Sequence, residues 1–100
     1  MRKLKAADEQ YRRLMELWPD EALSYWCYGG FLAYETRDRT AAEKYLRKAV
    51  EIDPLCDVAN YHLGNHLLCW DLRTEAKRFL MRAAKLGYED ARELLRRMDA

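Results

Sequence analysis

Residues 42–54 have the sequence AEKYLRKAVEIDP. Small residues, a leucine and a proline follow one another in this segment at intervals of four, three and five: Ala42, Leu46, Ala49 and Pro54. The same intervals recur over residues 7–19, and the first two recur over residues 76–83. The copies begin 35 and 34 residues apart, and self-similarity at such a period indicates a repeat architecture.

A second set of matching residues stands between the copies, and its central member is a glycine. Gly29 and Gly64 are 35 residues apart, and each lies 10 residues after a proline. Glycine in a helix interior costs about 1 kcal/mol relative to alanine, so we expect a neighbouring helix to cross closely at each glycine. The alanines of the repeat are expected to form the other side of this contact: Ala42, Ala49, Ala76 and Ala83. The one extra residue of the first period is expected in the turn at residues 35–39.

The composition indicates helices throughout the chain. Ala, Leu, Glu, Lys and Arg predominate, whereas Val and Ile together number three, which disfavours a β-sheet. Asp20 and Asp57 are expected to cap the helices that follow them, and residues 40–43, TAAE, match a capping box. The predicted helices cover residues 2–18, 21–36, 40–52, 56–70, 73–86 and 88–98. We therefore predict an all-α chain of about six helices that forms one domain, residues 1–100.

The period and the spacing resemble those of the tetratricopeptide-repeat (TPR) family, whose pattern is W-x2-L-G-x2-Y, then A-x3-F, then P, on a period of about 34 residues. Gly29 and Gly64 match the glycine of that pattern. Tyr25 and Asn60 stand at its tryptophan position. The resemblance covers nearly the whole chain and implies a right-handed α-solenoid of antiparallel helix pairs. It divides the chain into half a repeat, two full helical hairpins and a closing helix.

The resemblance also implies that the chain binds a protein or peptide partner, because in TPR proteins the first helix of each pair lines a concave groove. The matched positions would form an apolar, aromatic groove: Leu23, Trp26, Tyr34, Tyr61, Asn65 and Leu68. Trp and Tyr side chains often dominate binding energy, and Asn65 is expected to hydrogen-bond the backbone of an extended peptide. The alternative is that these aromatic side chains pack against the terminal helices, 2–18 and 88–98.

A second hypothesis for the function is self-association. The chain begins with half a repeat and ends with an incomplete one, and an uncapped solenoid end leaves apolar surface open to another copy. The alternative to a peptide-binding module is therefore a homodimer with no separate peptide ligand.

The charge balance and the apolar runs argue against other partners. A formal net charge of +1 gives no electrostatic surplus for nucleic acid. No apolar run approaches the roughly 20 residues that cross a bilayer, so we expect no membrane partner. The three cysteines are widely separated and form no C-x-x-C pair, so a cytoplasmic protein with reduced thiols is predicted.

The sequence lacks the motifs of an enzyme. No serine or threonine lies in a nucleophile elbow, and no glycine-rich loop could hold a phosphate, so we predict no catalytic activity and no cofactor. His62, His66 and Cys69 stand at i, i+4 and i+7 of a predicted helix, a spacing that suits zinc. A fourth ligand is not apparent, so packed or surface histidines without a metal are preferred.

Overall fold

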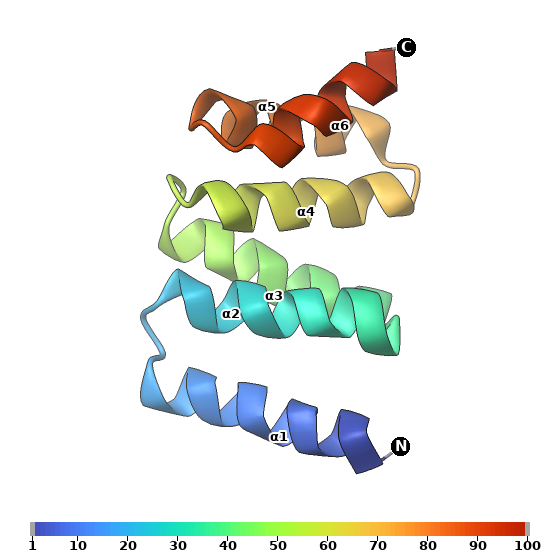
Figure 1. Cartoon of the computed structure of the whole chain (residues 1–100). Helices are drawn as coiled ribbons and strands as arrows, with labels where there is room; N and C mark the ends of the chain where they lie inside the picture. Colours follow the sequence, from blue (N-terminus) through green and yellow to red (C-terminus); the bar gives the residue numbers. More distant parts are fainter. Residues whose placement is uncertain (1, 100) are drawn as a thin grey trace. The chain divides into compact units, whose positions relative to one another are not determined.

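The chain folds into α-helices, and the computed structural model describes residues 2–99, with side chains from residue 4 onward. The elements are α1 (Arg2–Leu17), α2 (Ala22–Phe31), a π-helical turn η1 (Leu32–Thr36) that continues α2, α3 (Arg39–Ile52), α4 (Asp57–Cys69), α5 (Arg73–Lys85) and α6 (Glu89–Asp99) (Figure 1). No β-strand occurs in the described residues. The all-α fold and the six predicted helices are confirmed, and when η1 is counted with α2 each helix begins and ends within one residue of its predicted limits. None of these helices combines the length and apolar character needed to cross a membrane.

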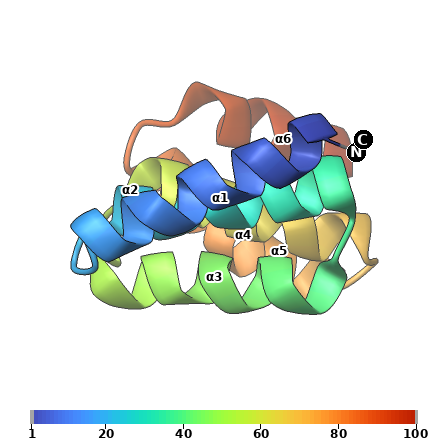
Figure 2. The ribbon, with the colours of Figure 1, turned by 90° about the horizontal axis from the view of Figure 1, so that it is seen from below.

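The chain divides after Asp53 into two compact units. In the first unit, α1 and α3 both pack against α2, and the colours of Figure 1 show α2 and α3 running in opposite directions. Figure 2, which views the molecule from below, shows that α1 lies along α2. In the second unit, α4 and α6 both pack against α5, and α4 and α5 are antiparallel. The expectation of one domain is not tested by this division and stays a prediction.

Each antiparallel pair contains one close contact between a glycine and a leucine. A β-carbon added to Gly29 would lie 2.7 Å from Leu46 Cγ and 3.0 Å from the Leu46 backbone nitrogen. A β-carbon added to Gly64 would lie 2.7 Å from Leu80 Cγ. Both leucines are fully buried, so each leucine occupies the volume that a side chain on the facing glycine would need. The expectation that another helix crosses at each glycine is confirmed.

The residue that fills the space over the glycine differs from the prediction. Leucine side chains, not the alanines, come closest to both glycines, although the Ala76 carbonyl oxygen would lie 3.2 Å from a β-carbon at Gly64. The alanines flank the leucine by about one helical turn and are fully buried: Ala42, Ala49, Ala76 and Ala83. Their small size lets the helices approach until the leucine reaches the glycine.

The turns at the two prolines are stabilised in equivalent ways, by a hydrogen bond from a side chain of the helix that follows. The hydroxyl of Tyr25 donates to the carbonyl oxygen of Pro19 at 2.7 Å. Thirty-five residues later, the Asn60 side-chain amide donates to the carbonyl oxygen of Pro54 at 3.0 Å and to that of Cys56 at 2.8 Å. Tyr25 and Asn60 therefore perform the same task, which explains how unlike residues share one repeat position.

The predicted helix caps are mostly wrong. Asp20 lies in the turn before α2 and does not occupy its N-cap position. Asp57 is the first residue of α4 rather than its cap. The side chain of Asp38 caps α3 by accepting from the Ala41 backbone nitrogen at 3.2 Å, so the predicted capping box at Thr40 lies inside the helix. Turn geometry decides which residue starts a helix, and residue spacing alone does not specify it.

The two adjacent glycines of α2 allow a matched test of the glycine–leucine contact. Gly29→Ala is expected to destabilise the protein by about 1–2 kcal/mol, because overpacking against Leu46 outweighs the gain of about 1 kcal/mol in helix propensity. Gly30→Ala is expected to stabilise the protein by up to about 1 kcal/mol, since its β-carbon would meet only Tyr34 Cε2, at 3.8 Å. Urea denaturation measures both, and equal effects of the two substitutions would contradict the contact. The penalty of Gly29→Ala should shrink in a Leu46→Ala background, which removes the side chain that blocks the β-carbon, although Leu46→Ala by itself costs about 2–5 kcal/mol.

Candidate functional site

The strongest candidate surface lies along α2 and η1, and we call it the α2 face: Leu23, Trp26, Gly30 and Tyr34. These residues follow one another at intervals of three, four and four, so they share one side of the helix. Leu23 is 51% exposed and Tyr34 is 46% exposed, whereas Trp26 is half-buried. The buried cluster among α1, α2 and α3 is built instead on other residues of α2, such as Tyr28 and Phe31.

Gly30 is the feature of the α2 face that packing does not explain. Its neighbour Gly29 is required by Leu46, but a β-carbon on Gly30 would find ordinary van der Waals contact with Tyr34 and nothing closer among the described residues. The Gly30 backbone is nonetheless buried, because side chains cover it while leaving room for a methyl group. The helix therefore bears the propensity cost of a glycine with no steric need for it.

Tyr34 lies in the π-helical turn η1. The only sign of this turn in the sequence was the one extra residue of the first repeat period. The carbonyl oxygen of Leu32 accepts from the backbone nitrogens of Arg37 and Asp38, the latter at 3.2 Å, and from Thr36 Oγ1 at 2.9 Å. At the equivalent turn of the second unit, the Leu67 carbonyl accepts from the Leu72 nitrogen at 3.0 Å, one residue sooner than the bond to Asp38. The extra residue is thus accommodated in the helix end and the turn that follows, close to the predicted position. Short π-helical segments occur frequently at functional sites.

Both of these turns end in a non-glycine residue with left-handed backbone. Arg37 has φ 58° and Asp71 has φ 62°, and the two are 34 residues apart. Asp tolerates this region better than most residues, whereas a long side chain such as Arg pays the ordinary steric penalty. The backbone of Arg37 is therefore strained, and it directly follows η1, the segment that contains Tyr34.

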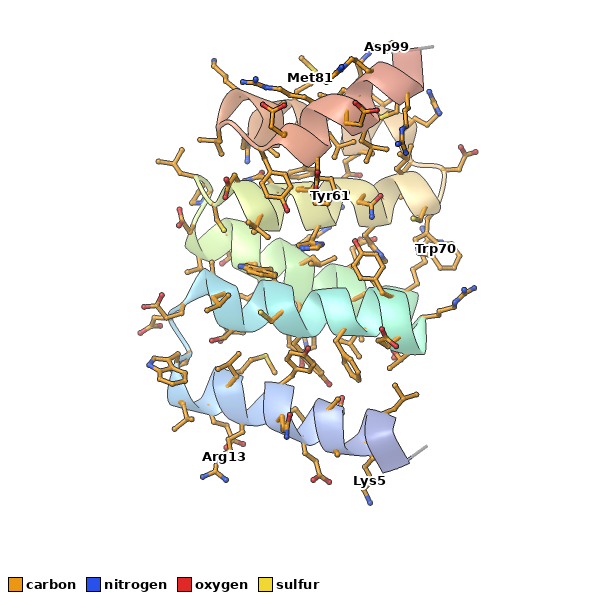
Figure 3. The ribbon with its side chains drawn as sticks, in the orientation of Figure 1. Lys5, Arg13, Tyr61, Trp70, Met81 and Asp99 are labelled. Carbon is orange, nitrogen blue, oxygen red and sulfur yellow. The ribbon has the colours of Figure 1, made fainter. Side chains whose placement is uncertain are left out.

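The predicted site residues of the second unit lie on α4 and are less accessible. Tyr61, Asn65 and Leu68 are all half-buried. The Tyr61 ring lies 4.9 Å from the ring of Tyr88 and packs on the buried cluster that contains Ala91 of α6 (Figure 3). Burial raises the pKa of Tyr61 above its usual 10.0. Packing against the closing helix, the alternative considered for the aromatic residues, therefore describes Tyr61 well.

A polar network that the sequence analysis did not anticipate joins α1 to α2. The hydroxyl of Tyr28 donates to Asp8 Oδ1 at 2.6 Å, and Arg12 Nε donates to Asp8 Oδ2 at 2.8 Å. Burial, followed by the bond to Asp8, raises the pKa of Tyr28 to about 12. The bond from Tyr28 lowers the pKa of Asp8 below 3.8. The spacing of Asp8 and Arg12 at i, i+4 was visible in the sequence, but their connection to Tyr28 depends on how α1 packs.

A surface cavity of about 440 Å³ opens beside this network, and its polar lining includes Asp8, Arg12, Asp38 and Lys44. Two carboxylates face two cations, so the lining has no net charge. Thr36 also borders the cavity, but its hydroxyl donates to the Leu32 carbonyl. The cavity does not present an activated nucleophile, and the absence of catalysis stays a prediction.

The possible zinc ligands differ in environment. His66 is 3% exposed, Cys69 is exposed, and burial lowers the pKa of His62 below 6.5. Within residues 2–99, no group of three or more His, Cys, Asp or Glu residues has a geometry that could hold a metal ion.

No protein-family model matches this chain, and no curated protein matches its sequence significantly.

The Tyr28 network predicts a pH-dependent contribution to stability. Tyr28→Phe is expected to lower the free energy of unfolding by about 1–2 kcal/mol at neutral pH, because the Asp8 carboxylate loses a strong donor that is only partly screened by solvent. The pKa of Tyr28 is raised in the folded state, so its contribution is complete below pH 10.0 and is lost as the pH rises towards about 12. Urea denaturation at several pH values should show the difference between the two proteins shrinking across this range. A difference that stays constant up to pH 12 would contradict the assignment.

The strained end of η1 gives a second prediction. Arg37→Gly is expected to stabilise the protein by about 0.5–1 kcal/mol, because glycine adopts positive φ without steric cost. Arg37→Ala, which removes the side chain but keeps the β-carbon, is the control and should give no comparable gain. Thermal denaturation of the three proteins distinguishes relief of backbone strain from loss of the charge.

Proposed function

We propose that this chain is a protein-interaction module of the TPR type, a right-handed solenoid of antiparallel helix pairs whose α2 face binds a peptide segment of another protein. The proposal is supported by the 34- to 35-residue period and by the glycine–leucine contact found in each unit. α4 carries the positions that match the α2 face, and we propose that Asn65 and Leu68 also contact the partner.

The observation that carries this proposal is Gly30. A glycine that weakens a helix without serving its packing is explained when another molecule must approach the backbone at that point. Trp26 stands one turn before it and Tyr34 one turn after it, so an incoming side chain would lie between two aromatic groups. Because the Gly30 backbone is covered in the free protein, binding would displace the Tyr34 ring that lies over it.

The chemistry of the α2 face defines the kind of partner. Leu23 and Trp26 supply apolar surface, and the Tyr34 hydroxyl can bond a peptide backbone. No Lys or Arg occurs between residues 14 and 36, so the face does not suit an acidic tail. An apolar or aromatic anchor residue within an uncharged or basic peptide fits these properties best.

A selection from a displayed random-peptide library would test the proposal. Peptides enriched on the wild-type protein should lose about 30-fold or more in affinity for Trp26→Ala and for Tyr34→Ala, the loss typical of a binding hot spot. Met81→Ala is the matched control, because Met81 is 56% exposed and lies on α5, which carries none of the predicted partner-binding residues. Gly30→Ala should fold at least as stably as the wild type and still bind more weakly.

The outcome that rejects the proposal is equally specific. If folded Trp26→Ala and Tyr34→Ala proteins bind the selected peptides as tightly as the wild type, the α2 face is not the binding surface. Circular dichroism establishes that each variant is folded before its affinity is measured.

A further inference from the structure

Two surfaces of the chain carry opposite charges that form no ion pairs with other described side chains. The first, the acidic corner, joins the end of α1 to the start of α2 and consists of Glu16, Leu17, Trp18, Asp20 and Glu21. The second, the basic face, lies on α5 and consists of Arg78, Met81, Arg82 and Lys85.

The acidic corner combines charge with exposed apolar groups. Leu17 is 58% exposed and Trp18 is 52% exposed. The carboxylates of Glu16, Asp20 and Glu21 form no ion pair with any described side chain. Carboxylates without ion-pair partners that lie beside large exposed apolar side chains are typical of a surface that is buried in an assembly.

The backbone of this corner is held rigid by α2. Ser24 Oγ donates to the Trp18 carbonyl at 2.9 Å, and Tyr25 donates to the Pro19 carbonyl at 2.7 Å. A hollow of about 280 Å³ lies beside Trp18, with mainly apolar walls: Leu14, Trp18, Glu21, Leu23 and Ser24. A preformed hollow lowers the entropic cost of binding.

The basic face has the complementary character. α5 has the sequence RTEAKRFLMRAAK, with five Lys or Arg residues and a single Glu. Met81 is 56% exposed and shares one side of the helix with Arg78, Arg82 and Lys85 (Figure 3 labels Met81). These three cations form no ion pair with any described side chain. By contrast, Lys77 on the same helix pairs with Asp99 at 3.3 Å.

The two Arg side chains of the basic face are also held in place. The guanidinium carbons of Arg78 and Arg82 lie 5.6 and 5.7 Å from the ring centroid of Phe79, which is 7% exposed. Contact with this ring restricts both side chains, so less entropy is lost when they meet carboxylates.

We propose that the acidic corner of one copy binds the basic face of a second copy, with Met81 entering the hollow beside Trp18. Three unpaired carboxylates then meet three unpaired cations around an apolar centre, and the flexible Met side chain suits an irregular cavity. The contact is heterologous, since the two copies use different surfaces, and it generates rings or short chains rather than only two-fold dimers. It shares only Leu23 with the α2 face and does not depend on peptide binding there.

Charge reversal tests this contact. The wild-type protein is expected to associate reversibly at concentrations between about 10 μM and 1 mM in low salt, with an average mass rising above 11.9 kDa in sedimentation velocity. About 1 M NaCl should weaken association by about tenfold or more, because salt screens exposed pairs. Met81→Ala should also weaken it.

Two triple variants separate this contact from any other. Glu16→Lys/Asp20→Lys/Glu21→Lys and Arg78→Glu/Arg82→Glu/Lys85→Glu should each be monomeric and folded, since five of the six residues are exposed and only Arg82 is half-buried. A mixture of the two should associate, because the basic face of the first meets the acidic corner of the second. A control that reverses Lys5, Lys44 and Lys48 lowers the net charge of the protein by the same amount as the Arg78→Glu/Arg82→Glu/Lys85→Glu variant and should associate like the wild type.

The proposal is overturned by any of three results. The wild type could stay monomeric up to about 1 mM in low salt. Either triple variant could associate as strongly as the wild type, or the mixture could remain monomeric. Circular dichroism on each variant excludes unfolding as the cause.

Discussion

The structure depends on one contact that occurs once in each unit, a leucine side chain resting on the backbone of a glycine in the facing helix. Leu46 lies over Gly29 and Leu80 lies over Gly64, at distances that leave no room for a β-carbon. Because the leucine must reach the opposite backbone, the residues one turn away have to be small. The buried alanines and the close crossing of the helices are therefore consequences of the same steric requirement.

The first unit departs from the second at the end of α2, and its candidate site lies there. One additional residue is taken up as a π-helical turn with a left-handed Arg37 after it. This irregular segment carries Tyr34, and Gly30 precedes it without a packing role. Local structure that is costly and unexplained by the core is found more often where a protein binds than where it only folds.

Charge is distributed unevenly in a chain whose net charge is close to zero. All three arginines of α6 pair with neighbouring carboxylates, and Arg12 pairs with Asp8, so these groups contribute mainly to the surface and to local structure. The charged groups of the acidic corner and of the basic face form no ion pairs with other described side chains, and they lie next to exposed apolar groups. The net charge of the chain therefore does not reveal the acidic corner and the basic face, the two surfaces that are best suited to association.

Helix number, helix limits and the positions of the close crossings follow from the sequence alone, because apolar spacing, proline and helix-interior glycine are local signals. Leu23, Trp26 and Tyr34 could likewise be placed on one side of a helix from their spacing. Other features were decided only when distant segments packed together: the leucine that fills the space over each glycine, the contact of Tyr61 with Tyr88, the bond from Tyr28 to Asp8 and the cap at Asp38. Each of these depends on distances between helices or on turn geometry, and the order of residues along one helix does not contain that information.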